Sequence, residues 1–85
     1  MNRYRVDVTI LPREGVPDTQ GAAVERALRE AGNTSVDGVR VGKFISFVVR
    51  ADGEAAASSE ARTIAGGLLA NDLIESYSFK LEPLT

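Results

Sequence analysis

The chain has 85 residues, 44% of them hydrophobic, and its 12 acidic and 10 basic side chains give a formal net charge of −2. It contains no histidine and no cysteine, which excludes the most versatile acid–base group at neutral pH, the strongest side-chain nucleophile and any disulfide. The negative charge argues against nucleic acid and anionic lipid as partners, and no segment approaches the roughly 20 apolar residues that span a bilayer, so we expect a cytoplasmic protein.

The first predicted element is a strand over about residues 3–11, in which apolar residues alternate with polar ones. Pro12 ends it because proline has no backbone N–H to donate to a neighbouring strand. Asp18 is a suitable N-cap for a helix over about residues 19–31, which Gly32-Asn33 would end. One face of this helix is apolar and the other is charged, as expected for a helix that packs on a core.

Two β-rich runs follow, at about residues 36–41 and 44–49. The Gly42-Lys43 pair between them predicts the tight turn of a hairpin, and the alternative is one long strand bent at a glycine bulge. A second helix is predicted over about residues 54–70, where apolar residues, most of them alanine, recur at helical spacing. Gly66-Gly67 within it indicates either the close approach of another backbone or a local weakness of the helix.

The last predicted strand alternates Tyr77, Phe79 and Leu81 with polar residues and ends at Pro83. The order of elements predicts a single α+β domain over residues 1–85 with a ferredoxin-like βαββαβ fold, a four-stranded antiparallel sheet with two helices on one face. The other sheet face would be exposed and polar, suitable for a wet interface. Its expected residues are Arg3, Arg5, Thr9, Ser76, Ser78 and Lys80.

A domain of this size has a thin core, and small domains compensate with disulfides, metals or association. With no cysteine and no histidine we expect association, as a homodimer or a larger homo-oligomer. No catalytic, cofactor-binding or metal-binding residue is assigned. The serines at 58 and 59 have no histidine to act as a base, and the nearby pairs of carboxylates do not have the spacing of a calcium loop.

The candidate interface residues are Arg40, Gly42 and Lys43. At the tip of the predicted hairpin, Arg40 and Lys43 would project beyond the sheet and contact an anionic ligand or a carboxylate of a partner protein. The alternative is an ordinary solvated hairpin end, since long charged side chains are commonly exposed.

Three segments together closely resemble the PurS family, the small subunits of phosphoribosylformylglycinamidine (FGAM) synthase. The first combines Tyr4-Arg5-Val6-Asp7-Val8 with residues 18–24 and Ala27-Leu28. The second is Val39-Arg40-Val41-Gly42-Lys43, and the third covers residues 68–77. Two departures are visible: Thr19 stands where the family usually has proline, and the second helix is unusually rich in alanine and glycine.

The resemblance implies a non-catalytic subunit for de novo purine biosynthesis. Such proteins bridge a glutaminase subunit, PurQ, which releases ammonia, and an ATP-dependent synthetase subunit, PurL, which converts formylglycinamide ribonucleotide (FGAR) to FGAM. The small subunit is thought to assist ammonia transfer, while ATP and magnesium are used by the synthetase, so no cofactor is expected in this chain. The alternative function is that of a ferredoxin-like regulatory domain that binds a small effector.

Overall fold

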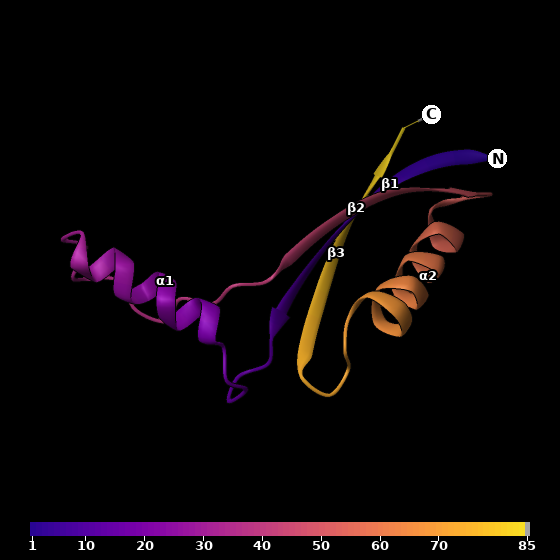
Figure 1. Cartoon of the computed structure of the whole chain (residues 1–85). Coiled ribbons are helices and arrows are strands. Elements are labelled where there is room, and N and C mark those ends of the chain that lie inside the picture. The colour runs from indigo at the N-terminus through magenta and orange to yellow at the C-terminus, as the bar shows by residue number, and fades with distance from the viewer. Residues whose placement is uncertain (85) are drawn as a thin grey trace.

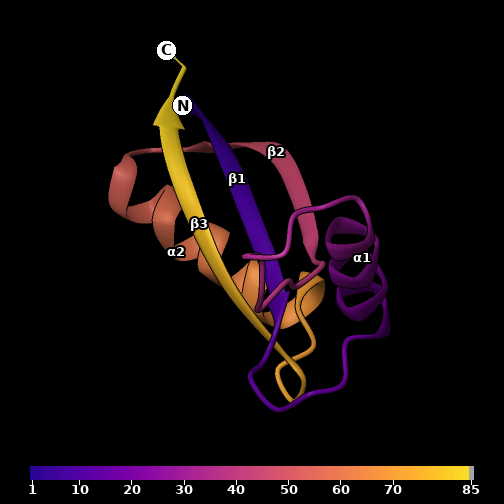
Figure 2. The ribbon, with the colours of Figure 1, turned by 90° about the vertical axis from the view of Figure 1, so that its left-hand side faces the viewer.

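The computed structural model describes residues 1–84 and contains one antiparallel sheet, two α-helices and a π-helical turn (Figure 1). The elements in chain order are β1 (Asn2–Pro12), α1 (Thr19–Glu30), β2 (Lys43–Ala51), α2 (Glu54–Ile64), η1 (Ala65–Leu69) and β3 (Glu75–Pro83). The strand order is β2-β1-β3, so β1 is central and both neighbours run antiparallel to it (Figure 2).

The core lies between the sheet and α2. In the register of the sheet, Val8 lies opposite Ile45 on one side and Phe79 on the other, and alternate residues of β1 point toward α2. The largest fully buried side chains come from this strand: Val6, Val8 and Ile10. From the helix come Ala57 and Ala61, also fully buried, whose small side chains let α2 lie close to the sheet. This explains why an alanine-rich helix suits the fold.

The second helix changes geometry before it ends. An α-helix predicted to run to residue 70 instead ends at Ile64 and continues as the five-residue π-helical turn η1. A Cβ atom at Gly66 would lie 3.1 Å from the Tyr77 hydroxyl oxygen, so this glycine admits the tyrosine ring. Gly67 has no such neighbour. The expected close approach of another backbone is therefore wrong, because the group nearest Gly66 is a side chain. The other alternative, a local weakness of the helix, agrees with the departure from regular α-helix at this turn.

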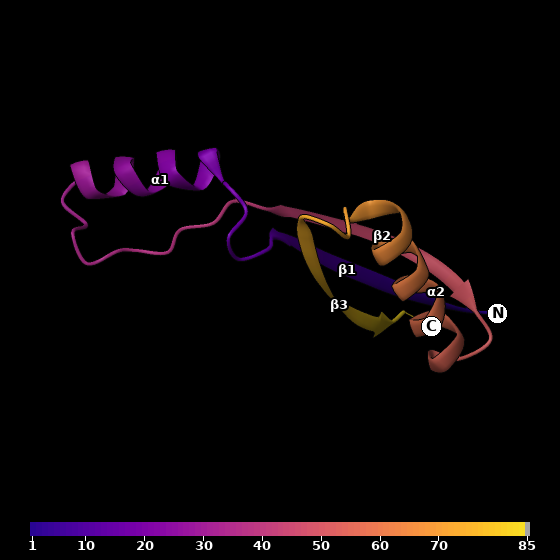
Figure 3. The ribbon, with the colours of Figure 1, turned by 90° about the horizontal axis from the view of Figure 1, so that it is seen from below.

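The prediction of a four-stranded sheet was wrong for this chain, because the sheet has three strands. Residues 36–42 form no strand, so neither the hairpin at Gly42-Lys43 nor one long bent strand is present. The reason is spatial. The segment runs back along α1, and these two parts together project beyond the end of the sheet, where no strand lies beside residues 36–41 (Figures 1 and 3). We call residues 19–42 the arm.

The expected placement of both helices on one sheet face was also wrong, because only α2 covers the sheet (Figure 3). The projecting arm makes the chain long and thin, with extents of 51 × 27 × 14 Å. Its radius of gyration is 16.4 Å, whereas a compact chain of this length would have about 12 Å. Val24 on α1 consequently remains 42% exposed. Neither α-helix in the described part of the chain is long and apolar enough to cross a membrane.

Candidate functional site at the base of the arm

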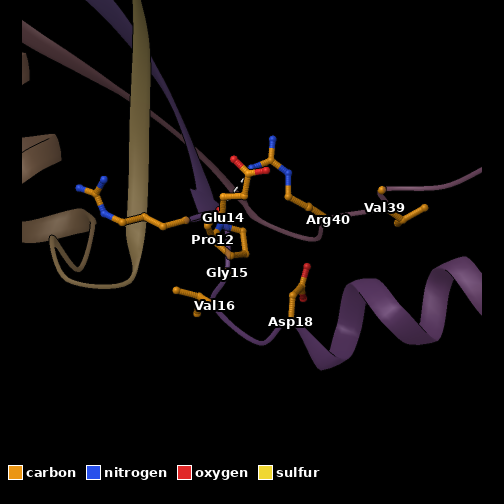
Figure 4. Close-up of a pocket in the computed structure, with 9 residues that line it drawn as sticks. Pro12, Glu14, Gly15, Val16, Asp18, Val39 and Arg40 are labelled. Carbon is orange, nitrogen blue, oxygen red and sulfur yellow. Dashed lines mark hydrogen bonds between the residues drawn. The ribbon is translucent and has the colours of Figure 1, made fainter.

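A cleft lies where the arm leaves the sheet, and its volume is about 450 Å³ (Figure 4). One wall is the loop that follows β1 and the other is the returning end of the arm. The lining residues are Pro12, Arg13, Glu14, Gly15, Val16, Asp18, Gly38, Val39 and Arg40. The cleft therefore lies between the two connections that join the arm to the sheet.

Asp18 fastens the two sides of the arm base together. Its Oδ1 accepts a hydrogen bond from the backbone N–H of Gly21 at 2.9 Å, which caps α1, and its Oδ2 accepts one from the N–H of Val41 at 3.0 Å. These two N–H groups, with a smaller effect of Arg40, hold the pKa of Asp18 below its ordinary value of 3.8. The ionised carboxylate thus joins the start of the arm to its end.

Two further features hold the returning segment against α1. Gly21 is buried, and a Cβ atom there would lie only 2.6 Å from the carbonyl oxygen of Val39, so only glycine allows this approach. Farther along the arm, Glu25 Oε1 accepts a hydrogen bond from the N–H of Val39 at 3.1 Å. The backbone N–H groups of Val39 and Val41, which in a sheet could pair with a neighbouring strand, are therefore bound by the carboxylates of Glu25 and Asp18.

The expected interface residues are near one another in sequence but have different surroundings. Arg40 is exposed beside the cleft, where its Nη1 donates a hydrogen bond to the carbonyl oxygen of Pro12 at 3.3 Å (Figure 4). Lys43 begins β2, and its Nζ lies 3.5 Å from Oε2 of Glu75 on β3. Because residues 36–42 form no strand, these two cations do not project together from a hairpin tip as expected.

Gly42 has a packing role at the junction of arm and sheet. A Cβ atom at this position would lie 2.0 Å from the carbonyl oxygen of Ile10, which is far closer than such atoms can approach. The absence of a side chain therefore lets the arm join β2 directly beside β1. On the other side of β1, the N–H of Asn71 and, more weakly, Lys43 hold the pKa of Glu75 below its ordinary value of 4.5.

The geometry of the site favours binding and positioning over catalysis. The carboxylates of Asp18 and Glu75 are engaged by backbone N–H groups and have lowered pKa values, which suits structural anions better than general acids. Among residues 1–84 no three side chains of the metal-binding types lie close enough together to hold an ion. What the site offers is a shaped cleft lined by two exposed arginines, Arg13 and Arg40.

Sequence reasoning identified Asp18 as a helix cap but not as the residue that holds Val41. It also missed the roles of Gly21 and Glu25, because their partners in the returning segment are 14 or more residues away along the chain. The only available signal was a glycine in the first turn of a helix, where it lowers helix stability without an evident local reason.

Comparison with known proteins gives a consistent family match. Residues 5–83 match the family model described as PurS: Phosphoribosylformylglycinamidine (FGAM) synthase. A curated relative from Synechocystis sp., named phosphoribosylformylglycinamidine synthase subunit PurS, is 40% identical over 81 residues. That alignment covers 95% of this chain and 81% of the relative.

Solved structures agree with the sequence match. PurS from Thermus thermophilus has a TM-score of 0.87 at 37% identity, with 98% of this chain and 99% of the other covered. A chain in the structure of PurLQS from Thermotoga maritima has a TM-score of 0.86 at 28% identity, covering 99% of this chain and all of that one (100%). The projecting arm is thus part of an arrangement that closely matches solved structures over nearly the whole chain.

Proposed function

The chain belongs to the PurS family of FGAM synthase subunits, and on that basis we propose that it is a non-catalytic subunit that joins the glutaminase PurQ to the synthetase PurL. It assists the transfer of ammonia during the ATP- and glutamine-dependent conversion of FGAR to FGAM in de novo purine biosynthesis. The main observation in support of this proposal is the family match over residues 5–83. The likeness to a chain of a PurLQS structure supports membership of a three-subunit complex.

A bridging role also agrees with the chemistry of the chain. It has no histidine or cysteine, so a base and nucleophile pair of the kind that a glutaminase needs is not available. We propose that this subunit itself holds no cofactor, and that ATP and magnesium are bound by the synthetase. We further propose that the chain acts as one domain in the cytoplasm, with no nucleic acid and no membrane as partners.

The test separates delivery of ammonia from the synthetase reaction. Purified PurL and PurQ are assayed for FGAM formation with glutamine or with ammonium chloride as the nitrogen source, with and without the chain. We expect glutamine-dependent synthesis to require the chain and ammonia-dependent synthesis to proceed without it. Equal glutamine-dependent rates in both samples would contradict the proposal. The chain alone should show no glutaminase or ATPase activity above a blank.

We also propose that the chain forms a homodimer, or a larger assembly of dimers, by exchange of the arm. Residues 36–41 have strand-forming character but no neighbour, while the outer edge of β2 has no strand beside it. On the inner face of β2, Ile45 and Phe47 are only partly buried, and on α1 Val24 is exposed. A second copy's arm would supply a fourth strand beside β2 and a helix over these side chains, as in domain swapping.

This assembly can be tested by light scattering during size-exclusion chromatography. Val24→Asp places a charge on the apolar face of α1 and should convert the dimer to a monomer at micromolar concentration. Ala56→Asp, at an exposed position of α2, is the matched control and should remain dimeric. A wild-type monomer, or a Val24→Asp dimer as stable as the control, would contradict arm exchange.

Arg40 and Lys43, with Gly42 between them, are proposed as contacts to a partner subunit at the base of the arm. Support comes from the exposure of both cations: the side chain of Lys43 is 60% exposed despite its pairing with Glu75, and Arg40 lies beside an open cleft. An exposed ion pair contributes little to stability, so stability alone is a weak reason for these charges.

A further inference from the structure

The strand β3 lies at one side of the sheet, and its outer side, which we call the β3 edge, has no strand beside it (Figure 2). Arm exchange would use the other side of the sheet, the outer edge of β2, so it leaves the β3 edge accessible. An edge strand exposes a row of backbone N–H and C=O groups that can pair with another chain. At 9 residues β3 is long for such a strand, since natural proteins commonly keep exposed edges short.

Two hydrogen bonds at the ends of β3 show which of its backbone groups point outward. The N–H of Leu84 donates to the carbonyl oxygen of Arg3 at 2.8 Å, and the N–H of Arg13 donates to that of Ile74 at 2.8 Å. Both bonds continue the register of β1 with β3, and each joins an even-numbered residue on the β3 side to an odd-numbered one on the β1 side. Bonded and non-bonded pairs alternate along an antiparallel ladder, so the even-numbered residues of β3 are bonded to β1. The interior residues whose backbone groups point away from β1 are Tyr77, Phe79 and Leu81.

These outward backbone groups have no partner in the chain itself. Within residues 1–84, no loop or side chain forms a hydrogen bond with them. Pro83 occupies the next outward position, where its missing N–H interrupts no bond of the ladder. The β3 edge therefore presents three successive residues whose N–H and C=O groups are ready to bind an added strand.

The side chains of the outward residues indicate what an added strand must carry on the side of α2. Tyr77, Phe79 and Leu81 point toward the core but are only partly buried. Apolar side chains of an added strand would cover them further, and aromatic residues pair favourably with apolar neighbours across a ladder. Arg62 of α2 also lies on this side, with its guanidinium 5.9 Å from the centroid of the Phe79 ring.

The charges along the β3 edge are unbalanced. The two carboxylates of β3, Glu75 and Glu82, are each paired with a cation. Among residues 1–84, Lys80 and Arg62 form no ion pair, and Asp7, opposite Lys80 in the register, is paired with an arginine instead. Pairs of opposite charge across a ladder are stabilising, so these two cations favour an added strand that carries carboxylates.

We propose that the β3 edge receives an extended segment of another subunit of the synthase, which adds a strand to the sheet. The residues of this segment alternate, with apolar side chains toward α2 and a carboxylate facing Lys80. The proposal rests on the proposed function, which requires a surface for a different polypeptide. Lysine at an edge also discourages pairing with unselected chains, so the edge discriminates in favour of the complementary charge. The β3 strand of a second copy is a poorer occupant, because the register that opposes all three outward residues brings the Lys80 side chains of both copies to diagonal positions.

Hydrogen exchange in the complex of the chain with PurL and PurQ is the decisive measurement, read at single residues by mass spectrometry. In the isolated chain the amides of Tyr77, Phe79 and Leu81 should exchange rapidly, because none has a hydrogen-bond partner. In the complex their exchange should slow by about tenfold or more. The amides of Ser78 and Lys80, which are bonded to β1 in both samples, are the internal control and should exchange slowly throughout.

Each outcome decides between the occupants. If the subunits bind but the three outward amides still exchange rapidly, the proposal for the β3 edge is wrong while the proposed function stands. If no complex forms, both are wrong. Slow exchange of these amides already in the isolated chain would assign the edge to a second copy and overturn the proposal.

Lys80→Gln tests the charge of the occupant. The variant should bind PurL and PurQ about threefold to tenfold more weakly in titration calorimetry, because it removes the cation that faces the carboxylate. Arg26→Gln is the matched control, since it removes one positive charge at an exposed position of α1, and it should bind like the wild type. Equal affinities of the two variants would contradict a carboxylate opposite Lys80.

Discussion

Replacement of Gly42 by alanine tests the junction of arm and sheet. The added Cβ atom would lie 2.0 Å from the carbonyl oxygen of Ile10, whereas carbon and oxygen atoms normally approach to about 3.3 Å. The backbone must therefore move by about 1 Å at a point where Ile10 is fully buried. Overpacking of this kind costs about 1–3 kcal/mol. For a domain of this size, a loss of about 2 kcal/mol lowers the melting temperature by about 8–16 °C.

The measurement is thermal denaturation followed by circular dichroism at one fixed protein concentration, because association affects the melting temperature. Gly67→Ala is the matched control. A Cβ atom at Gly67 has no heavy atom within 4 Å, and alanine favours helical backbone more than glycine does, so this variant should melt at or above the wild-type temperature. If Gly42→Ala melts within about 2 °C of the wild type, the steric argument for this position is wrong.

Three further outcomes are expected. The pKa values of Asp18 and Glu75 are lowered in the fold, so the stability that these two carboxylates contribute is fully present above their ordinary values of 3.8 and 4.5. It is lost as the pH falls below those values and through the lowered pKa values of the folded protein. In urea denaturation, the free energy of unfolding of Asp18→Asn should therefore differ less between pH 6 and pH 3 than that of the wild type. An equal difference in both proteins would refute this. Ile10→Ala should lower the free energy of unfolding by about 2–5 kcal/mol, and a loss below about 1 kcal/mol would mean that the site is not core. The double variant Arg40→Ala with Lys43→Ala should weaken assembly with PurQ and PurL by about 30-fold while barely changing the melting temperature, and normal assembly would remove these residues as contacts.

Most of the regular structure could be predicted from local patterns. Alternation of apolar and polar residues located β1 and β3, a β-rich run located β2, and helical spacing located α1 and α2, although the predicted second helix ran on to residue 70. These patterns depend on which side of an element meets the core, and β1, β2, β3 and α2 each have one such side. The helix α1 has an apolar face too, but in the single chain that face lies outside the core. The exposed polar face of the sheet was predicted for the same reason, because the polar positions alternate with buried ones in β1 and with partly buried ones in β3.

The missing strand shows what local patterns cannot reveal. Valines at 36, 39 and 41 favour extended backbone, and the segment is indeed not helical. A strand, however, also needs a neighbour with free hydrogen-bonding groups, and in a single chain the arm has none. The same limit applies to the base of the arm. The bond from Val41 to Asp18 and the ion pair of Lys43 with Glu75 depend on distances between remote segments, which no spacing in the sequence encodes.

The order of the strands also determines when the chain can fold during synthesis. The central strand β1 is made first, yet it gains its neighbours only at residues 43–51 and 75–83. Tyr4, for example, lies opposite Val49 and Pro83, so one of its neighbours is made 79 residues (83 − 4) after it. Such long separations slow folding, because the loops must close before the contacts form. The sheet should therefore form only once the C-terminal strand has left the ribosome, and a nascent chain that ends before β3 should remain sensitive to protease.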